Sequence, residues 1–172
     1  MTNLALRSSG ALIFLLGVGV VGASPASAHA IADLSGVTAY AGQTSVMTLE
    51  VQHGCLTNEL GIDKVLVTFN KHFGKVKPKR VSGWESKVRA TQHKGQRVVY
   101  NLIGEVPAFN QPTYFPMKIS WPTEPGVYGI PVTQVCDGEV NHWNVPDAPA
   151  TADKPSPPLY PLPQVQVLPY HP

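Results

Sequence analysis

Prolines and glycines interrupt this chain at short intervals, and they limit the secondary structure that it can form. The 172 residues include 17 prolines and 15 glycines, and β-branched and aromatic residues fill the stretches between them. Proline breaks the interior of a helix, whereas short apolar runs bounded by turn residues are typical of strands. We therefore expect short strands and no substantial helix in the mature chain.

Seven segments alternate apolar and polar residues in the way that half-buried strands do. In the first segment, Met47, Leu49 and Val51 share one face. In the fourth, Pro116 falls on the outward face, which indicates an edge strand or a bulge. The segments span residues 45–53, 64–70, 97–103, 114–121, 127–135, 140–145 and 164–168, and an Asp-Gly turn at 137–138 joins the fifth to the sixth. This spacing predicts an all-β fold, an immunoglobulin-like or cupredoxin-like β-sandwich of about seven strands.

The N-terminus has the pattern of a secretory signal peptide. Arg7 precedes an apolar run over residues 10–22, and the Ala-Ser-Ala sequence at 26–28 has the small-residue form that signal peptidase cleaves. Cleavage there makes residues 1–28 the signal peptide and His29 the first residue of the mature chain. Cleavage after residue 26 or residue 30 is the alternative.

An N-terminal histidine has a chemistry of its own. The α-amine and imidazole of His29 can chelate one metal ion, and their reference pKa values of about 8 and about 6.5 leave both free of protons near neutral pH. Two nitrogen ligands in one plane suit square-planar Cu(II) better than tetrahedral zinc. Any residue can follow a signal peptide, so the junction alone favours an incidental histidine. Because the third mature residue, Ile31, is not a histidine, copper binding would depend on the folded scaffold.

Length and charge narrow the class of protein. The mature chain is long enough for one domain with a substantial core, and we expect a β-sandwich over residues 29–145 followed by a proline-rich extended segment with a last short strand over residues 146–172. The chain has 13 Lys and Arg residues against 11 Asp and Glu, which does not indicate a nucleic-acid-binding surface. Its only long apolar run lies in the signal peptide, and this run is shorter than the length that a transmembrane helix needs. We therefore expect a periplasmic or secreted protein with no transmembrane segment after signal removal.

Two cysteines, Cys55 and Cys136, are present. An even count in an exported chain predicts a disulfide bond. The bond would close a loop of roughly 80 residues and would stabilise the fold by about 4 kcal/mol in the chain-entropy model. A copper site built from both thiolates is the alternative, and oxidation outside the cytoplasm disfavours it.

The six histidines form no recognisable metal-binding pair along the chain. His72 and His93 have lysine and arginine neighbours, which disfavour a bound cation, and His171 lies one residue from the C-terminus. His53 shares the buried face of the first strand, where we expect a partly buried, hydrogen-bonded structural histidine. His142 lies close to acidic residues, but the tryptophan beside it points to the opposite face of the strand. No serine–histidine–acid arrangement or paired carboxylate supports a hydrolase.

Several short motifs follow one another in a fixed order along the mature chain. They are His-Gly-Cys at 53–55, Gly-Trp at 83–84, Trp-Pro-Thr-Glu-Pro-Gly at 121–126 and Ile-Pro-Val-Thr-Gln-Val-Cys-Asp-Gly-Glu at 130–139, followed by Trp143. This order resembles the YcnI-type family of periplasmic copper-binding proteins, whose signal peptide also ends directly before a histidine, and the resemblance extends from His29 to about Leu168. It implies that Trp84 packs on the sandwich in a Gly-Trp turn and that the two cysteines match the pair found in some members.

The resemblance also implies a copper(II) site. The amine and imidazole of His29 would bind the metal and Trp143 would lie against it, since an indole face can shield a cation and contact it through its π-system. Without the resemblance, a core tryptophan is the simpler reading of Trp143. The family completes the site with a glutamate, but the matching stretch at 109–115 has no carboxylate. Tyr114 or Gln111 would then replace it, or the site would be weaker or lost.

Three functions follow as expectations. The first is an exported, non-enzymatic Cu(II)-binding protein that buffers, stores or delivers copper, with a copper transporter or another copper protein as its partner. The second is a copper-dependent polysaccharide monooxygenase-like enzyme, which needs a second histidine, His142 or His53, and a flat aromatic surface for its substrate. The third is a metal-free immunoglobulin-like interaction module in which His29 is incidental.

Overall fold

The computed structural model describes residues 30–154, 156 and 158–171, and these residues contain no helix. The predicted signal peptide at residues 1–28 and His29 lie outside the described residues. Twelve strands occur in the described part of the chain: β1 Ala30–Asp33, β2 Ala39–Tyr40, β3 Thr44–Val51, β4 Lys64–Phe69, β5 Val76–Pro78, β6 Trp84–Ala90, β7 Gln96–Leu102, β8 Thr113–Ser120, β9 Gly126–Gly129, β10 Val132–Cys136, β11 Glu139–Trp143 and β12 Gln164–Leu168. The all-β expectation is confirmed.

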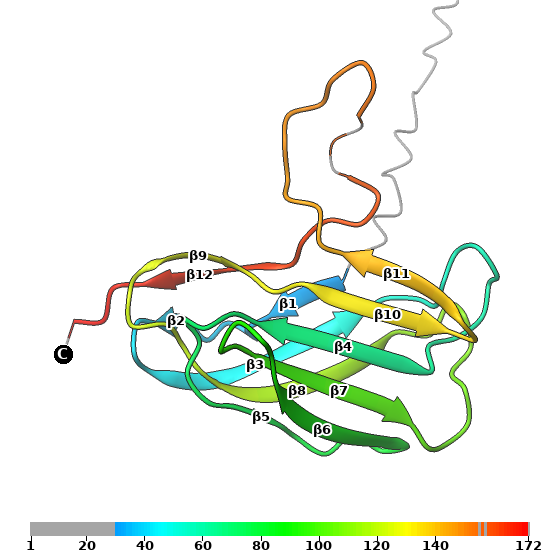
Figure 1. The fold of residues 1–172 in the computed structure, drawn as a ribbon, viewed down its shortest axis with the longest axis horizontal. Helices are drawn as coiled ribbons and strands as arrows, with labels where there is room; N and C mark the ends of the chain where they lie inside the picture. The colour runs from blue at the N-terminus through cyan, green and yellow to red at the C-terminus, as the bar shows by residue number, and fades with distance from the viewer. Residues whose placement is uncertain (1–29, 155, 157, 172) are drawn as a thin grey trace, which may run out of the picture.

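The strands form two main layers. A four-stranded sheet has the order β1-β3-β8-β5, and a five-stranded sheet has the order β11-β10-β4-β7-β6. Figure 1 shows the five-stranded sheet in front of the four-stranded sheet. A third, small sheet has the order β2-β12-β9, and its β2–β12 pair is parallel. The arrangement is the β-sandwich that the turn spacing predicts.

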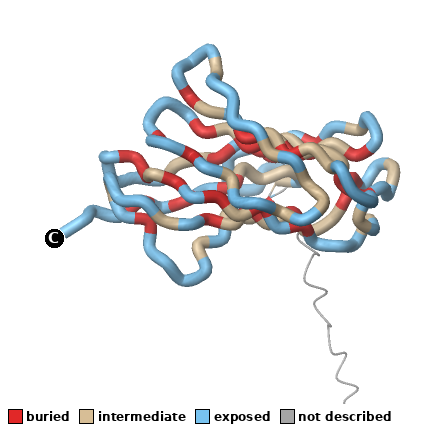
Figure 2. The backbone as a smooth tube through the Cα atoms, turned by 90° about the horizontal axis from the view of Figure 1, so that it is seen from below, coloured by how far each residue is buried: buried red, intermediate tan, exposed pale blue. Residues whose placement is uncertain are grey.

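The core lies between the two main sheets. Met47, Leu49 and Val51 of β3 are all 0% exposed, which confirms the predicted inward face of that strand. From β8, Phe115 and Met117 are paired with Leu49 and Met47 and share this face. The five-stranded sheet supplies the opposite wall, and buried residues follow the strands while the connections between them are largely exposed (Figure 2).

The position of Pro116 corrects the prediction of an edge strand. β8 lies between β3 and β5, and its register with β3 runs without a bulge. The C=O of Pro116 accepts a hydrogen bond from the N–H of Lys79 at 2.9 Å, one residue past the end of β5 at Pro78. The N and O of a strand residue point to the same neighbour, so the missing N–H of Pro116 falls where β5 has just ended. The proline is therefore accommodated inside the sheet.

The segment predicted as one strand over residues 127–135 is two strands. β9 pairs with β12 of the small sheet, whereas β10 pairs with β4 and β11 of the five-stranded sheet. Ile130 and Pro131 lie between them, and the chain crosses from one sheet to the other at this point. After β10, Asp137 and Gly138 have φ values of 48° and 87°, the left-handed pair that a tight hairpin needs. The predicted Asp-Gly turn is confirmed.

A disulfide bond joins Cys55, just after β3, to Cys136, the last residue of β10. The two cysteines are 81 residues apart in sequence, and both are 0% exposed. The bond links the four-stranded sheet to the five-stranded sheet, so the disulfide predicted from the cysteine count is confirmed and the thiolate copper site is excluded. None of the described residues belongs to a helix long and apolar enough to cross a membrane.

Candidate metal centre

Trp143 ends β11 on the inner face of the sandwich and is 1% exposed. Its Nε1–H donates to Oε1 of Gln134 at 3.0 Å, across the β10–β11 pair. The side chain of Gln134 is itself fully buried, and its Nε2–H donates to the backbone C=O of His53 at 2.7 Å. The indole ring is therefore held in one orientation by a buried amide that also fixes the segment after β3.

His53 lies beside Trp143. Their ring centroids are 6.4 Å apart, and the ring centroid of Phe109 lies 5.6 Å from that of His53. Nδ1 of His53 is 2.6 Å from the C=O of Gly54. A carbonyl only accepts hydrogen bonds, so Nδ1 is the donor, and Nε2 is the ring nitrogen that has a lone pair whenever the ring is neutral. The expectation of a partly buried, hydrogen-bonded histidine is confirmed, and one ring nitrogen remains a potential ligand.

The start of β1 lies at the same end of the sandwich. Ala30 pairs with Val51, two residues before His53 in the chain. A cavity of about 230 Å³ runs along the free edge of β1. It is lined by Ala30, Ile31, Ala32, Asp147, Pro161, Pro163 and Gln164. Tyr160 directly precedes Pro161, one of the lining residues, in the sequence. Its ring packs edge-on against Trp143, with 5.2 Å between the ring centroids. In Figure 1, the 144–163 connection leaves the sandwich at the end of β11.

Two carboxylates lie near the start of β1. Asp147 lines the cavity at its free edge. Glu50 of β3 lies directly across from Ile31 on the outer face of the sheet, and Tyr114 of β8 lies across from Glu50. Tyr114 and Gln111, the sequence candidates for the fourth ligand, line a different cavity of about 530 Å³ that also contains Glu105. Asp147 is therefore the carboxylate that shares a cavity with the start of β1, and sequence analysis did not select it.

The remaining histidines lie elsewhere. His72 and His93 are exposed in connections between strands, and His171 is exposed beyond β12. His142 is exposed on the outer face of β11, with Nδ1 3.3 Å from Oγ1 of Thr133. Within residues 30–154, 156 and 158–171, no three His, Cys, Asp or Glu side chains are close enough together to hold a metal ion.

Gln134 and Trp84 show what sequence patterns can and cannot locate. Gln134 lies on the same face of β10 as the buried residues Val132 and Cys136, so the alternation of the sequence predicts a buried amide. Its hydrogen-bond partners, Trp143 and the carbonyl of His53, lie outside β10, and the sequence does not identify them. Trp84 follows Gly83, whose φ is 76°, and packs edge-on against Phe115 at 4.9 Å. The Gly-Trp turn that packs on the sandwich is confirmed.

Comparisons with known proteins place this fold in a family. A family described as "Domain of unknown function (DUF1775)" matches residues 31–167. A crystal structure of an uncharacterized protein from Nocardia farcinica, described as having an immunoglobulin-like fold, is 24% identical with a TM-score of 0.64, and the match covers 82% of this chain and 99% of that one. A cohesin module of a Clostridium perfringens family 33 glycoside hydrolase is 10% identical with a TM-score of 0.49, covering 81% and 93% of the two chains. No curated protein matches the chain. The protein has an immunoglobulin-like sandwich and belongs to the DUF1775 family.

Proposed function

We propose that this protein is an exported Cu(II)-binding protein that buffers, stores or delivers copper. One observation carries the proposal: Ala30, the residue after His29, begins a strand whose edge cavity contains Asp147 and whose partner strand, β3, leads to His53. The ring of His53 lies beside that of Trp143, at the end of β11. A peptide bond fixes successive Cα atoms about 3.8 Å apart. We infer that a mature chain starting at His29 would carry its α-amine and imidazole close to the start of β1.

The donors available here suit copper. The amine and imidazole of His29, Nε2 of His53 and the carboxylate of Asp147 are nitrogen and oxygen ligands, and such sets favour Cu(II) in tetragonal geometry. The site lacks free thiolates because both cysteines are in the disulfide. Copper at this position would be held by His29, with Asp147 in the place that the YcnI-type family gives to glutamate. Bound Cu(II) would supply a stored or transferable cation.

The fixed orientation of the Trp143 ring also supports the proposal of a copper site. Its N–H is already paired with Gln134, so the ring rather than the nitrogen is the group left to contact a metal. An aromatic face beside a cation shields it from water and contributes attraction through the π-electrons. We assign this role to Trp143, and we expect copper binding to quench its fluorescence.

The chemistry of the chain favours a location outside the cytoplasm. A buried disulfide persists in oxidising compartments, and the small-residue motif at 26–28 suits removal of a signal peptide. We propose that residues 29–145 form the copper-binding domain and that residues 146–172 form an extended segment that covers Trp143. A copper transporter or another exported copper protein would be the partner in transfer.

The contribution of Asp147 can be tested by Cu(II) titration of the mature protein against a competing chelator. Asp147→Asn should weaken binding about tenfold, because a neutral amide replaces an anionic ligand. Glu50→Gln and Asp153→Asn are the matched controls, and both should bind as the parent protein does. Equal affinity in all four proteins would remove Asp147 from the site, whereas a loss confined to Glu50→Gln would assign the ligand to Glu50.

A polysaccharide monooxygenase is the second candidate, and the position of His53 beside Trp143 is the observation that favours it. Such enzymes need a second histidine at the copper, and His142, the other candidate, lies on the outer face of the sandwich. The discriminating assay is oxidation of chitin or cellulose by the copper-loaded protein with a reductant. Our proposal predicts no oxidised product, and product that disappears in His53→Ala would replace it with the enzyme.

A further inference from the structure

Two arginines lie directly opposite each other on the outer face of the five-stranded sheet. Arg89 of β6 pairs in register with Arg97 of β7, and Arg97 pairs with Thr68 of β4. Like charges at directly opposed positions destabilise a sheet. In the described part of the chain, the single ion pair joins Lys87 to Glu85, so neither arginine has a carboxylate partner there. An anionic ligand would remove this repulsion.

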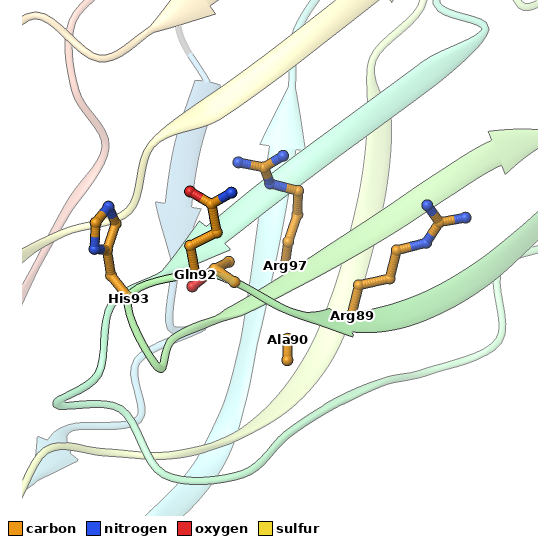
Figure 3. A pocket seen from close by; sticks show the side chains of 6 residues that line it. Arg89, Ala90, Gln92, His93 and Arg97 are labelled. Atoms are coloured by element: carbon orange, nitrogen blue, oxygen red, sulfur yellow. The ribbon is translucent and has the colours of Figure 1, made fainter.

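The hairpin that joins β6 to β7 adds further basic groups. Two adjoining cavities of about 470 Å³ and about 710 Å³ open here, and residues 91–93 and Arg97 line both. No Asp or Glu lines either cavity. The basic side chains that line them are Arg89, Arg97, Lys71, Lys94, His72 and His93. Figure 3 shows the side chains of Arg89, Gln92, His93 and Arg97 extending to the same side of the hairpin.

Hydrogen bonds orient Arg97 and close the hairpin loop in the absence of a ligand. Nε of Arg97 donates to Oγ1 of Thr68 at 3.3 Å, which orients the guanidinium and leaves its terminal N–H groups available. The hairpin loop is closed by two hydrogen bonds between Thr91 and Gly95, at 2.9 Å and 3.0 Å. A fixed guanidinium presents parallel donors that match two oxygens of a phosphate group. The cavity volumes fall within the range of small-molecule sites, and they exceed the size of a single phosphate ion.

We propose that Arg89, Arg97 and the β6–β7 hairpin form a binding site for a phosphate-bearing ligand, a phosphoester larger than free phosphate. The opposed arginines hold the phosphate oxygens. Lys71 and Lys94 add positive charge at the second cavity, and Gln92 donates or accepts hydrogen bonds to the rest of the ligand. The site is independent of the copper proposal because it uses no residue at the start of β1.

Thermal unfolding at low ionic strength tests the site with inorganic phosphate as the probe. A ligand that binds only the native state raises the melting temperature, so we expect a saturable rise with phosphate and no comparable rise with chloride. In the absence of phosphate, Arg89→Gln should melt no lower than the parent protein, because the variant removes a repulsion. A shift that grows without saturation and matches that of chloride would overturn the proposal.

The variants separate a built site from general surface charge. Arg89→Gln and Arg97→Gln should each weaken phosphate binding about tenfold, as read from amide and guanidinium NMR shifts. Arg80→Gln, an exposed arginine in the connection after β5, is the matched control and should bind as the parent does. Equal effects of all three variants would mean exposed charge only, of the kind that protects an edge strand such as β6, and would overturn the site.

A second experiment distinguishes a phosphate group on a lipid from one on a soluble molecule. Co-sedimentation with phosphatidylglycerol vesicles but not phosphatidylcholine vesicles, lost in Arg89→Gln, would identify a lipid headgroup. Saturable binding of glycerol 3-phosphate that is tighter than that of inorganic phosphate, without vesicle binding, would identify a soluble phosphoester. Either result supports the site, and binding in neither arm contradicts it.

Discussion

At the scale of single residues, Tyr100 and Gln134 show how the interior of the sandwich accommodates polar groups. Tyr100 of β7 is 0% exposed, its hydroxyl donates to the C=O of Pro116 at 3.4 Å, and its ring packs on Phe115. Burial raises the pKa of Tyr100 well above its ordinary value, because the anionic form would lose its hydration. Gln134 is a second buried polar side chain, and both ends of its amide are hydrogen-bonded.

The raised pKa of Tyr100 predicts a loss of stability in alkali. In the unfolded chain this tyrosine loses its proton near pH 10, whereas in the folded protein it keeps it. Its contribution is therefore fully present below pH 10 and falls above it, by up to about 1.4 kcal/mol per pH unit. Urea unfolding from pH 8 to pH 11 should show the free energy of unfolding of the parent falling relative to that of Tyr100→Phe. The exposed control Tyr114→Phe should follow the parent, and parallel curves for the parent and Tyr100→Phe would contradict the account.

The paired amide of Gln134 predicts a costly substitution. Gln134→Leu keeps a similar volume but leaves the Trp143 N–H and the His53 carbonyl without partners, each costing about 1–3 kcal/mol. We expect the free energy of unfolding to fall by at least about 2 kcal/mol, measured by urea unfolding with tryptophan fluorescence. Gln166→Leu on the exposed face of β12 is the control and should change it by less than about 0.5 kcal/mol. Similar effects of both substitutions would argue against the network.

At the scale of strands, the sequence was informative wherever one face of a strand is buried. β3, β4, β7 and β8 are found where alternation predicted them, because their inward residues meet the opposite sheet. β1, β2, β5 and β6 were not predicted. β1, β2 and β5 have two to four residues and are too short to show a period, and β6 is an edge strand with mostly exposed residues. Asp147 could not be associated with β1 either, because only the three-dimensional path of the 144–163 connection brings them together.

The disulfide predicts how strongly the two sheets depend on each other. Removing it in Cys55→Ser/Cys136→Ser should lower the free energy of unfolding by about 4 kcal/mol, since the unfolded chain regains the freedom of a long loop. Urea unfolding of the double variant should coincide with that of the parent protein in reductant, which provides the control. A change below about 1 kcal/mol would mean that the sheets hold together without the bond.

At the scale of the whole molecule, the fold brings three distant parts of the chain to one end of the sandwich: the start of β1, the segment after β3 and the end of β11. A chain that begins at His29, as we propose, would have Ile31 rather than a histidine at its third position and could not wrap copper with its first three residues alone. Copper affinity should therefore depend on folding.

Denaturation of the mature protein should weaken Cu(II) binding far more than it does for a peptide with histidine at position three, which serves as the control. Competition titrations in the presence and absence of denaturant measure this difference. Equal affinities of the folded and denatured protein would show that the scaffold contributes nothing to the site.

The most direct test of the copper site compares two proteins by electron paramagnetic resonance and tryptophan fluorescence during Cu(II) titration. One begins at His29 and the other carries a single extra residue before it. The account predicts tight one-to-one binding with nitrogen hyperfine lines and tryptophan quenching in the first protein, and loss of both in the second. Equal binding in the two proteins, or none in either, would contradict it and leave an immunoglobulin-like module in which His29 is incidental.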